Sequence, residues 1–431
     1  MSGPFLWLAA TTGVLSLLTP CVFPMIPVTV AYFSSEGNRQ HSGIKAATLF
    51  GIGIIATFTI LGLALAGVFG AAGLSRFAAD PRVNLLLAIL FLAFAANLFG
   101  VFAPRLPWRL QTAAVNSVNQ IPRGSSLGAL MMGATFTLTS VTCTAPFVGT
   151  LLVLAAQGSW TTPIIGMLVY STAFAVPFVL LAMAPRYLTR LPRSGEWIKT
   201  LRVLIGLLEV AAAIKFVSNA DLVLGWGIFT RATVLALWAG LAVVAAIYLA
   251  RKLPNQLQPR RASMTTFIPS AIALVVALWL AAGVGGRPIK SLEAFLPPTA
   301  VRANLAGAAV SGEAWILNDY DRAVNLARSS GKFVFIDFTG YTCTNCRWME
   351  ANIFNRPDVT LELDRFVLAR LYTDGEGPVY ERQQAFQEKT FGTVALPLYA
   401  IVDAEGKIRA TFSGLTRDPA EFISFLQRAQ S

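Results

Sequence analysis

The sequence predicts a polytopic α-helical membrane domain followed by a soluble α/β domain. Its 431 residues are 55% hydrophobic and only 13% charged, a composition typical of integral membrane proteins. Charge is also unevenly distributed: residues 1–309 hold 21 Lys and Arg against 6 Asp and Glu, whereas residues 310–431 hold 13 against 16. The basic excess lies in short loops between apolar runs, which favours orientation in a bilayer over nucleic-acid binding.

Eight apolar windows, each long enough to cross the hydrocarbon core, predict eight spans. Alternate loops hold fourteen Lys and Arg on one side and four on the other, so the positive-inside rule places both termini outside the cytoplasm. We therefore expect a bacterial inner-membrane protein whose soluble domain is periplasmic. The first window lacks a basic n-region and a small-residue cleavage site, so we interpret it as a span and not as a signal peptide. The windows lie near 5–34, 44–70, 83–103, 125–157, 162–184, 200–218, 230–250 and 264–284.

Two membrane cysteines share a local pattern, in which proline follows the cysteine after three residues. Proline breaks a helix, which a membrane tolerates where the freed backbone groups are buried in protein or wet. Because each pattern opens a block of three spans, we predict two inverted three-helix repeats that bring the cysteines face to face. A plain packing role for small apolar cysteines stays open. The residues concerned are Cys21 with Pro20, Pro24 and Pro27 in "TPCVFPMIP", and Cys143 with Pro146 in "VTCTAPFVG".

One further polar residue stands out in the membrane domain, the carboxylic acid Glu209 in the sixth window. Intramembrane acids are costly and are often functional. A structural hydrogen bond or a pairing with Lys215 explains it equally well. Its role is therefore left open.

The soluble part follows a membrane domain at 1–284 and a linker at 285–310, and it occupies 311–431. Its predicted order is helix, strand, cysteine pair, helix, strand, helix, hairpin and helix, which is the order of a thioredoxin fold. The elements are expected at 321–330, 332–338, 345–354, 365–373, 380–391, a hairpin over 396–414 that turns at 404–406, and a helix from Pro419.

The cysteine pair of this domain, Cys343 and Cys346, lies where a strand meets a helix. The first sulfur is expected to cap the helix, where amides stabilise a thiolate, and the second can resolve a mixed disulfide. A structural zinc site would need two more ligands, but the only histidine, His41, is in a cytoplasmic loop and the domain has no other cysteine. We expect no metal, while a static disulfide stays open.

Three residues near the pair are further candidates. Asp337 lies six residues before Cys343, and Glu350 lies seven after it on the helix. A half-buried carboxylate there could accept and return the proton of the resolving thiol. Pro397 opens the strand expected beside the pair, and in a thioredoxin fold this proline is cis.

The chain resembles the DsbD-type family of membrane thiol-disulfide interchange reductases, whose smaller relatives are the CcdA proteins. The motifs "LLTPCVFPMIPV", "TCTAPFVG" and "FIDFTGYTCTNCRWME" occur in the order expected of that family. The resemblance implies that electrons come from cytoplasmic thioredoxin, pass to the Cys21 and Cys143 pair, and leave through Cys343 and Cys346 to periplasmic protein disulfides. No bound cofactor is implied.

This chain departs from the family pattern in two places. Larger members begin with an immunoglobulin-like periplasmic domain that carries its own cysteine pair, whereas the first window here begins near residue 5. In those members this cysteine pair hands electrons to the final targets. We therefore expect that either a separate protein passes on the electrons here or the thioredoxin-like domain meets its substrates directly. Tyr341 and Thr342 precede the pair where tryptophan is commoner before the first cysteine, which could change the redox potential or the choice of partner.

Two other functions remain possible on sequence grounds. A solute or metal transporter could use the soluble domain as a binding module, although the methionines are scattered and His41 stands alone. An oxidase that passes electrons to quinone would use the same cysteines. The sequence has no GxGxxG and no haem-attachment CxxCH motif, so no nucleotide or covalent haem is predicted. The final substrate is left open.

Overall fold

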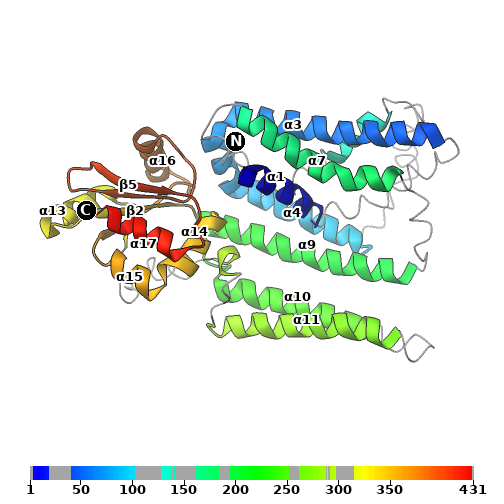
Figure 1. The fold of residues 1–431 in the computed structure, drawn as a ribbon. Helices are drawn as coiled ribbons and strands as arrows, with labels where there is room; N and C mark the ends of the chain where they lie inside the picture. The colour runs from blue at the N-terminus through cyan, green and yellow to red at the C-terminus, as the bar shows by residue number, and fades with distance from the viewer. Residues whose placement is uncertain are drawn as a thin grey trace. The chain divides into compact units, whose positions relative to one another are not determined.

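The computed structural model describes most of the chain as helices and one five-stranded sheet (Figure 1). The apolar part contains helices α1 (Gly3–Leu15, continued by the 3-10 turn η1, Ser16–Leu18), α3 (Gln40–Ala79), α4 (Pro81–Leu98), α7 (Thr161–Met183), α9 (Gly195–Leu224), α10 (Arg231–Arg251) and α11 (Ala262–Val284). Residues 128–137 are also helical. The described residues are 3–18, 40–101, 128–137, 140, 161–183, 195–251, 262–287, 289, 292–297 and 315–429.

Several of these helices have the length and composition of membrane spans. Within the described residues, Lys45–Ala64, Pro81–Leu98 and Arg231–Arg251 are apolar over at least 18 residues, and Leu6–Leu15, Ile164–Leu180 and Ile268–Val284 are shorter apolar helices. The membrane character is therefore confirmed, whereas eight spans and inverted repeats stay predictions. The membrane cysteines and their prolines lie outside the described residues: Cys21, Cys143, Pro20, Pro24, Pro27 and Pro146.

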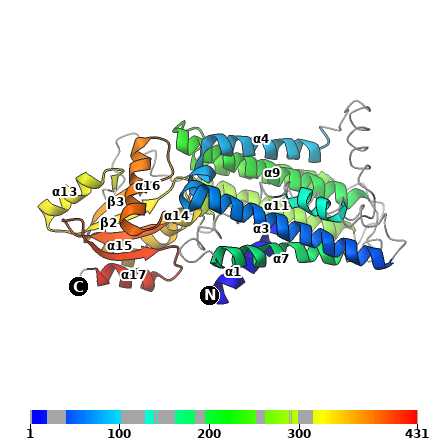
Figure 2. The ribbon, with the colours of Figure 1, turned by 90° about the horizontal axis from the view of Figure 1, so that it is seen from above.

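The chain divides into two compact units, 1–74 with 91–209, and 75–90 with 210–431. In the first unit, aromatic side chains of α3, α7 and residues 128–137 form one core, as in the edge-to-face contact of Phe58 with Phe174. Figure 2 shows α1 and α7 side by side. Gly13 allows this close approach, since a Cβ there would lie 2.5 Å from the Tyr170 carbonyl oxygen. Close packing through small residues is typical of membrane helices.

Glu209, the intramembrane acid, is fully buried in α9. Within the described part of the chain, neither of its carboxylate oxygens has a hydrogen-bond partner, so neither of the two structural explanations left open, a hydrogen bond or a pairing with Lys215, is seen.

In the second unit, α10 and α11 pack side by side, and Arg231 at the start of α10 binds the end of α11 and the chain that follows it. Its guanidinium donates to the carbonyl oxygens of Gly283 (2.8 Å) and Arg287 (3.0 Å) and to both carboxylate oxygens of Glu293 (2.6 and 3.1 Å). Burial opposes ionisation of Glu293, but these hydrogen bonds hold its pKa below the ordinary value. The described part of the predicted linker thus includes an anchored turn, η3 (Glu293–Phe295).

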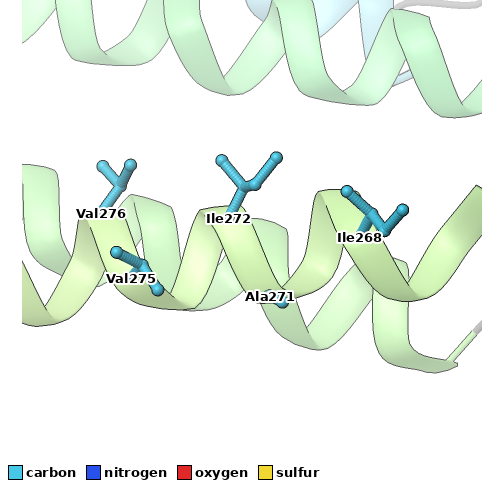
Figure 3. Close-up of a pocket in the computed structure, with 5 residues that line it drawn as sticks. All are labelled: Ile268, Ala271, Ile272, Val275 and Val276. Carbon is cyan, nitrogen blue, oxygen red and sulfur yellow. The ribbon is translucent and has the colours of Figure 1, made fainter.

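The face of α11 that does not pack against α10 is apolar and exposed. Figure 3 shows Ile268, Ile272 and Val276 pointing to the same side of the helix, where they line a shallow pocket with Ala271 and Val275. Ile272 is 58% exposed and Val275 64% exposed. Such a face suits lipid chains, as expected for a span.

The domain at residues 315–429 has a sheet of order β1-β3-β2-β4-β5. Strands β1, β3 and β2 are parallel to one another, and β4 is antiparallel to both of its neighbours, β2 and β5. This mixed sheet confirms the thioredoxin-like prediction. The elements are β1 (Ile316–Leu317), α13 (Tyr320–Ser330), β2 (Val334–Thr339), α14 (Thr344–Met349) continued by the π-helical turn η4 (Glu350–Phe354), α15 (Pro357–Leu363), β3 (Val367–Tyr372), α16 (Pro378–Phe391), β4 (Leu398–Val402), β5 (Ile408–Ser413) and α17 (Pro419–Arg428).

Side chains that alternate along the strands build two cores. Phe335, Leu368 and Tyr399 face α14, η4, α15 and α17, whereas Ile336 and Ala369 face α13 and α16. Figure 1 shows α16 on one side of the sheet and α15 and α17 on the other. In this alternation Asp337 belongs to the face that α14 and η4 cover.

Candidate functional site

Cys343 lies at the N-terminus of α14, where the chain leaves β2 through residues 340–342. It is the N-cap residue, and its Sγ accepts a hydrogen bond from the Cys346 amide at 3.2 Å. The helix-capping sulfur predicted from the sequence is therefore confirmed. Cys343 and Cys346 form a disulfide in which Cys343 is half-buried and Cys346 is fully buried. A partner can thus reach the first sulfur more readily than the second.

Pro397 precedes β4 and follows a cis peptide bond with Leu396, as expected of this fold. Phe338 of β2 pairs with Leu398, the first residue of β4. Pro397, just before Leu398, therefore lies at the end of the sheet where β2 ends. The loop that carries Cys343 starts at this same end. The backbone at Pro397 is held there by a bond from the Gly414 amide to the Pro397 carbonyl oxygen at 2.9 Å.

Asp337 lies in the middle of β2 and is 1% exposed. Its register partner on β3 is Arg370, whose Nε donates to Asp337 Oδ2 at 2.8 Å. Within the described residues, Asp337 Oδ1 has no hydrogen-bond partner. Burial raises the pKa of Asp337 to about 6, although the Arg370 charge opposes this change. A carboxyl group with this pKa can exchange protons near neutral pH.

Glu350 is the first residue of η4 and lies close to the same arginine. Its Oε1 is 2.7 Å from Arg347 Nη2 and 3.8 Å from Arg370 Nε. The Thr339 hydroxyl, at the end of β2, bridges the group because it receives a bond from Arg347 Nη2 at 2.9 Å and lies 3.4 Å from Glu350 Oε1. The buried carboxyl group of Asp337, the partly exposed carboxylate of Glu350 and two guanidinium groups therefore form one charge-balanced cluster beside α14.

Arg347 and Arg370 were not among the residues singled out from the sequence. Arg347 is 5% exposed and Arg370 is 8% exposed, and the Arg370 guanidinium stacks over the Trp315 ring with 4.1 Å to its centroid. A signal existed for Arg370, because it interrupts the apolar strand "RFVLARLYT". A charge within a buried strand needs a partner, and the acid of the neighbouring strand was available.

The chemistry that this site supports is dithiol-disulfide exchange assisted by a buried proton acceptor. Within the described ranges, no cluster of three or more His, Cys, Asp or Glu residues could hold a metal ion. The predicted site residues Asp337, Cys343, Cys346, Glu350 and Pro397 all lie on or next to β2, α14, η4 and β4. Their catalytic roles, and any contribution from the membrane cysteines, remain proposals.

Two family models match the chain in its two parts. Residues 5–220 match the cytochrome c biogenesis protein transmembrane domain, and residues 315–404 match a thioredoxin-like domain. Proteins named "Thiol:disulfide interchange protein DsbD" are similar over most of the chain. The protein of Vibrio vulnificus strain YJ016 is 29% identical over 99% of this chain and 67% of its own length. The protein of Vibrio cholerae is 29% identical over 94% of this chain and 63% of its own length, and that of Salmonella typhimurium strain LT2 is 30% identical over 84% and 59%.

Proposed function

This chain belongs to the DsbD-type family of membrane thiol-disulfide interchange proteins, and we propose that it carries electrons outward across the inner membrane to reduce periplasmic protein disulfides. The observation that carries the proposal is the position of the Cys343 and Cys346 pair, at the N-terminus of a helix that packs on the same face of the sheet as the buried carboxyl group of Asp337. Protein-disulfide reduction is the enzymatic activity that this geometry and the family support together.

In the outer step the disulfide bond passes from the partner, through a mixed disulfide, to the cysteine pair of this chain. The Cys343 thiolate attacks one sulfur of a partner disulfide, so a mixed disulfide forms and the other partner sulfur leaves as a thiolate that takes up a proton. Cys346, once deprotonated, attacks Cys343 Sγ and releases the second partner sulfur. The partner gains two electrons and two protons, and the Cys343–Cys346 disulfide is formed.

Asp337 and Glu350 serve this step as proton-handling groups in our proposal. Cys346 is fully buried, so its thiol loses a proton in a place that bulk water reaches poorly. A carboxyl group whose pKa is about 6, such as Asp337, is charged often enough near neutral pH to accept that proton. Thr339 connects Glu350 with Arg347, and Arg370 connects Glu350 with Asp337, so the two acids act within one network.

The supply of electrons is assigned to Cys21 and Cys143, which cytoplasmic thioredoxin would reduce. A dithiol on the periplasmic face becomes oxidised unless it is continually reduced. The only other cysteines of the chain are these two, both within predicted spans. The reduced membrane pair would attack the Cys343–Cys346 disulfide and return it to the dithiol, with two electrons moving outward for each cycle.

The proposal can be tested with the purified full chain in liposomes. Thioredoxin, thioredoxin reductase and NADPH are supplied on the cytoplasmic side, and the thiols of the Cys343 peptide are counted by mass spectrometry after alkylation. We expect reduction of the outer pair that requires both Cys21 and Cys143. Reduction that persists in Cys21→Ser, or no reduction in the wild type, would contradict the electron path and would favour the oxidase or binding-module alternatives.

A further inference from the structure

The two residues before Cys343 are held by one buried carboxylate, that of Asp374. Asp374 lies two residues beyond the end of β3, and Gly340 follows the end of β2. Because β2 and β3 are parallel neighbours, their carboxyl ends meet at the same edge of the sheet. The residue that follows one strand can therefore bind the segment that follows the other.

The contacts use both oxygens of Asp374. Oδ1 accepts the amide of Tyr341 at 2.7 Å, and Oδ2 accepts the amide of Thr342 at 3.0 Å and its hydroxyl at 3.1 Å. Gly340 makes room for this arrangement, since a Cβ there would lie 2.6 Å from Oδ2. A group that accepts bonds from three donors at these distances behaves as the ionised carboxylate.

The surroundings of Asp374 supply little opposite charge. The Tyr341 ring stacks on Tyr372 with centroids 4.1 Å apart, and its hydroxyl lies 3.2 Å from that of Tyr380 on α16. Burial raises the pKa of Asp374, whereas the bonds from the two amides and the charge of Arg347 on α14 oppose this. Arg347 is itself paired with Glu350, which in turn lies near Arg370 and Asp337. These are the charged and titratable groups that face the segment from β2, β3, α14, η4 and α16.

We propose that Asp374 is a positioning residue that makes the Cys343–Cys346 pair a stronger reductant. It binds the two amides that precede Cys343, so those donors are not available to the sulfur, and its fixed negative charge lies beside the segment that carries the nucleophile. Both effects disfavour the Cys343 thiolate relative to the disulfide. The inference rests on the proposed function and gives a role to the backbone amides of Tyr341 and Thr342.

Reduction of the disulfide adds two electrons and two protons and creates the Cys343 thiol or thiolate. A charge that disfavours the thiolate shifts the equilibrium toward the disulfide at any pH where the thiolate forms. The pair then gives its electrons more readily to a partner disulfide, which suits an outlet for reducing equivalents.

The test compares Asp374→Asn with wild type in the full-length protein in detergent. Both are reduced with dithiothreitol, and the rate of iodoacetamide alkylation of the Cys343 peptide is followed from pH 5 to pH 10 by mass spectrometry. We expect the midpoint of this profile to fall by about one pH unit in the variant. In glutathione buffers at a pH above both midpoints, the ratio of dithiol to disulfide in Asp374→Asn is expected to be up to about tenfold higher than in wild type.

Two matched variants separate the charge from other effects. Glu376→Gln makes the same change of charge two residues away at an exposed position, and Thr342→Val removes only the hydroxyl that binds Oδ2. Both are expected to keep the wild-type midpoint. If Asp374→Asn does not fold, Gly340→Ala tests the same point, because its methyl group would push the carboxylate away from the amides and lower the midpoint.

An unchanged or raised midpoint in Asp374→Asn, or an equal fall in Thr342→Val or Glu376→Gln, would overturn the role of Asp374. Failure of the proposed function would look different, because reduced wild-type protein would then not exchange with a model disulfide at any pH. The two ideas can therefore fail separately.

Discussion

The replacement of Asp337 by asparagine is expected to remove a pH dependence of stability from the thioredoxin-like domain. Burial raises the pKa of this carboxyl from 3.8 to about 6 in the folded protein. The folded state thus binds a proton that the unfolded state has already lost between about pH 4 and pH 6, so the stability due to this group falls as pH rises through that range. A difference of about two pH units corresponds to about 3 kcal/mol.

Asparagine resembles the protonated acid and does not titrate. The free energy of unfolding of Asp337→Asn minus that of wild type is therefore expected to increase by about 3 kcal/mol from pH 4 to pH 7 and to stay constant above pH 7. The ion pair with Arg370 forms and is lost together with the charge of Asp337, so its effect is already included in the pKa. Any offset that does not depend on pH cancels in this difference between pH values.

The assay is urea unfolding of oxidised residues 311–431, followed by tryptophan fluorescence at several pH values. Asp364→Asn is the control, because this side chain is exposed, and its difference from wild type is expected to stay flat. A flat difference for Asp337→Asn as well would refute the reasoning, and so would one that decreases as the pH rises.

Three further outcomes follow from the contacts of the described residues. Arg347→Ala removes a buried guanidinium group from the cluster and leaves the Glu350 carboxylate, 16% exposed, without its 2.7 Å partner, so it is expected to lower the free energy of unfolding by about 3 kcal/mol; Arg356→Ala, which breaks an exposed pair, is expected to leave the urea midpoint unchanged. Glu293→Ala removes the acid that binds the start of α10 and is expected to speed tryptic cleavage after α11 in detergent-solubilised protein; an unchanged cleavage rate would contradict the anchoring. Cys346→Ser is expected to accumulate mixed disulfides that reductant dissolves on gels, and Cys343→Ser is expected to form none; equal amounts in both would reverse the assigned roles.

Much of the fold follows from local features of the sequence. Apolar windows predicted the described membrane helices, and the order of amphipathic and apolar runs predicted the thioredoxin-like domain. The position of Cys343 at a helix N-cap was also predictable, because a strand-to-helix junction is marked within a few residues. Two elements were missed: β1 has only two residues, and α15 is a short helix that starts at Pro357. Neither is long enough to show a period.

The charge cluster was only half predictable, for a different reason. Asp337 and Glu350 could be identified by their distance along the chain from the cysteines. Their arginine partners depend on the register of β2 against β3, which pairs Asp337 with Arg370, and on the helical turn that brings Arg347 to Glu350. Register is a tertiary property, because it is set by which faces of the strands are buried. The same holds for Asp374 and the amides of the loop that it binds.

The central claim is that the outer cysteine pair receives its electrons through the membrane cysteines. The most direct measurement traps free thiols with acid in growing cells and determines the redox state of Cys343 and Cys346 in wild type and in Cys21→Ser. The account predicts a reduced pair in wild type and an oxidised pair in the variant. A pair that is oxidised in both strains, or reduced in both, would contradict it.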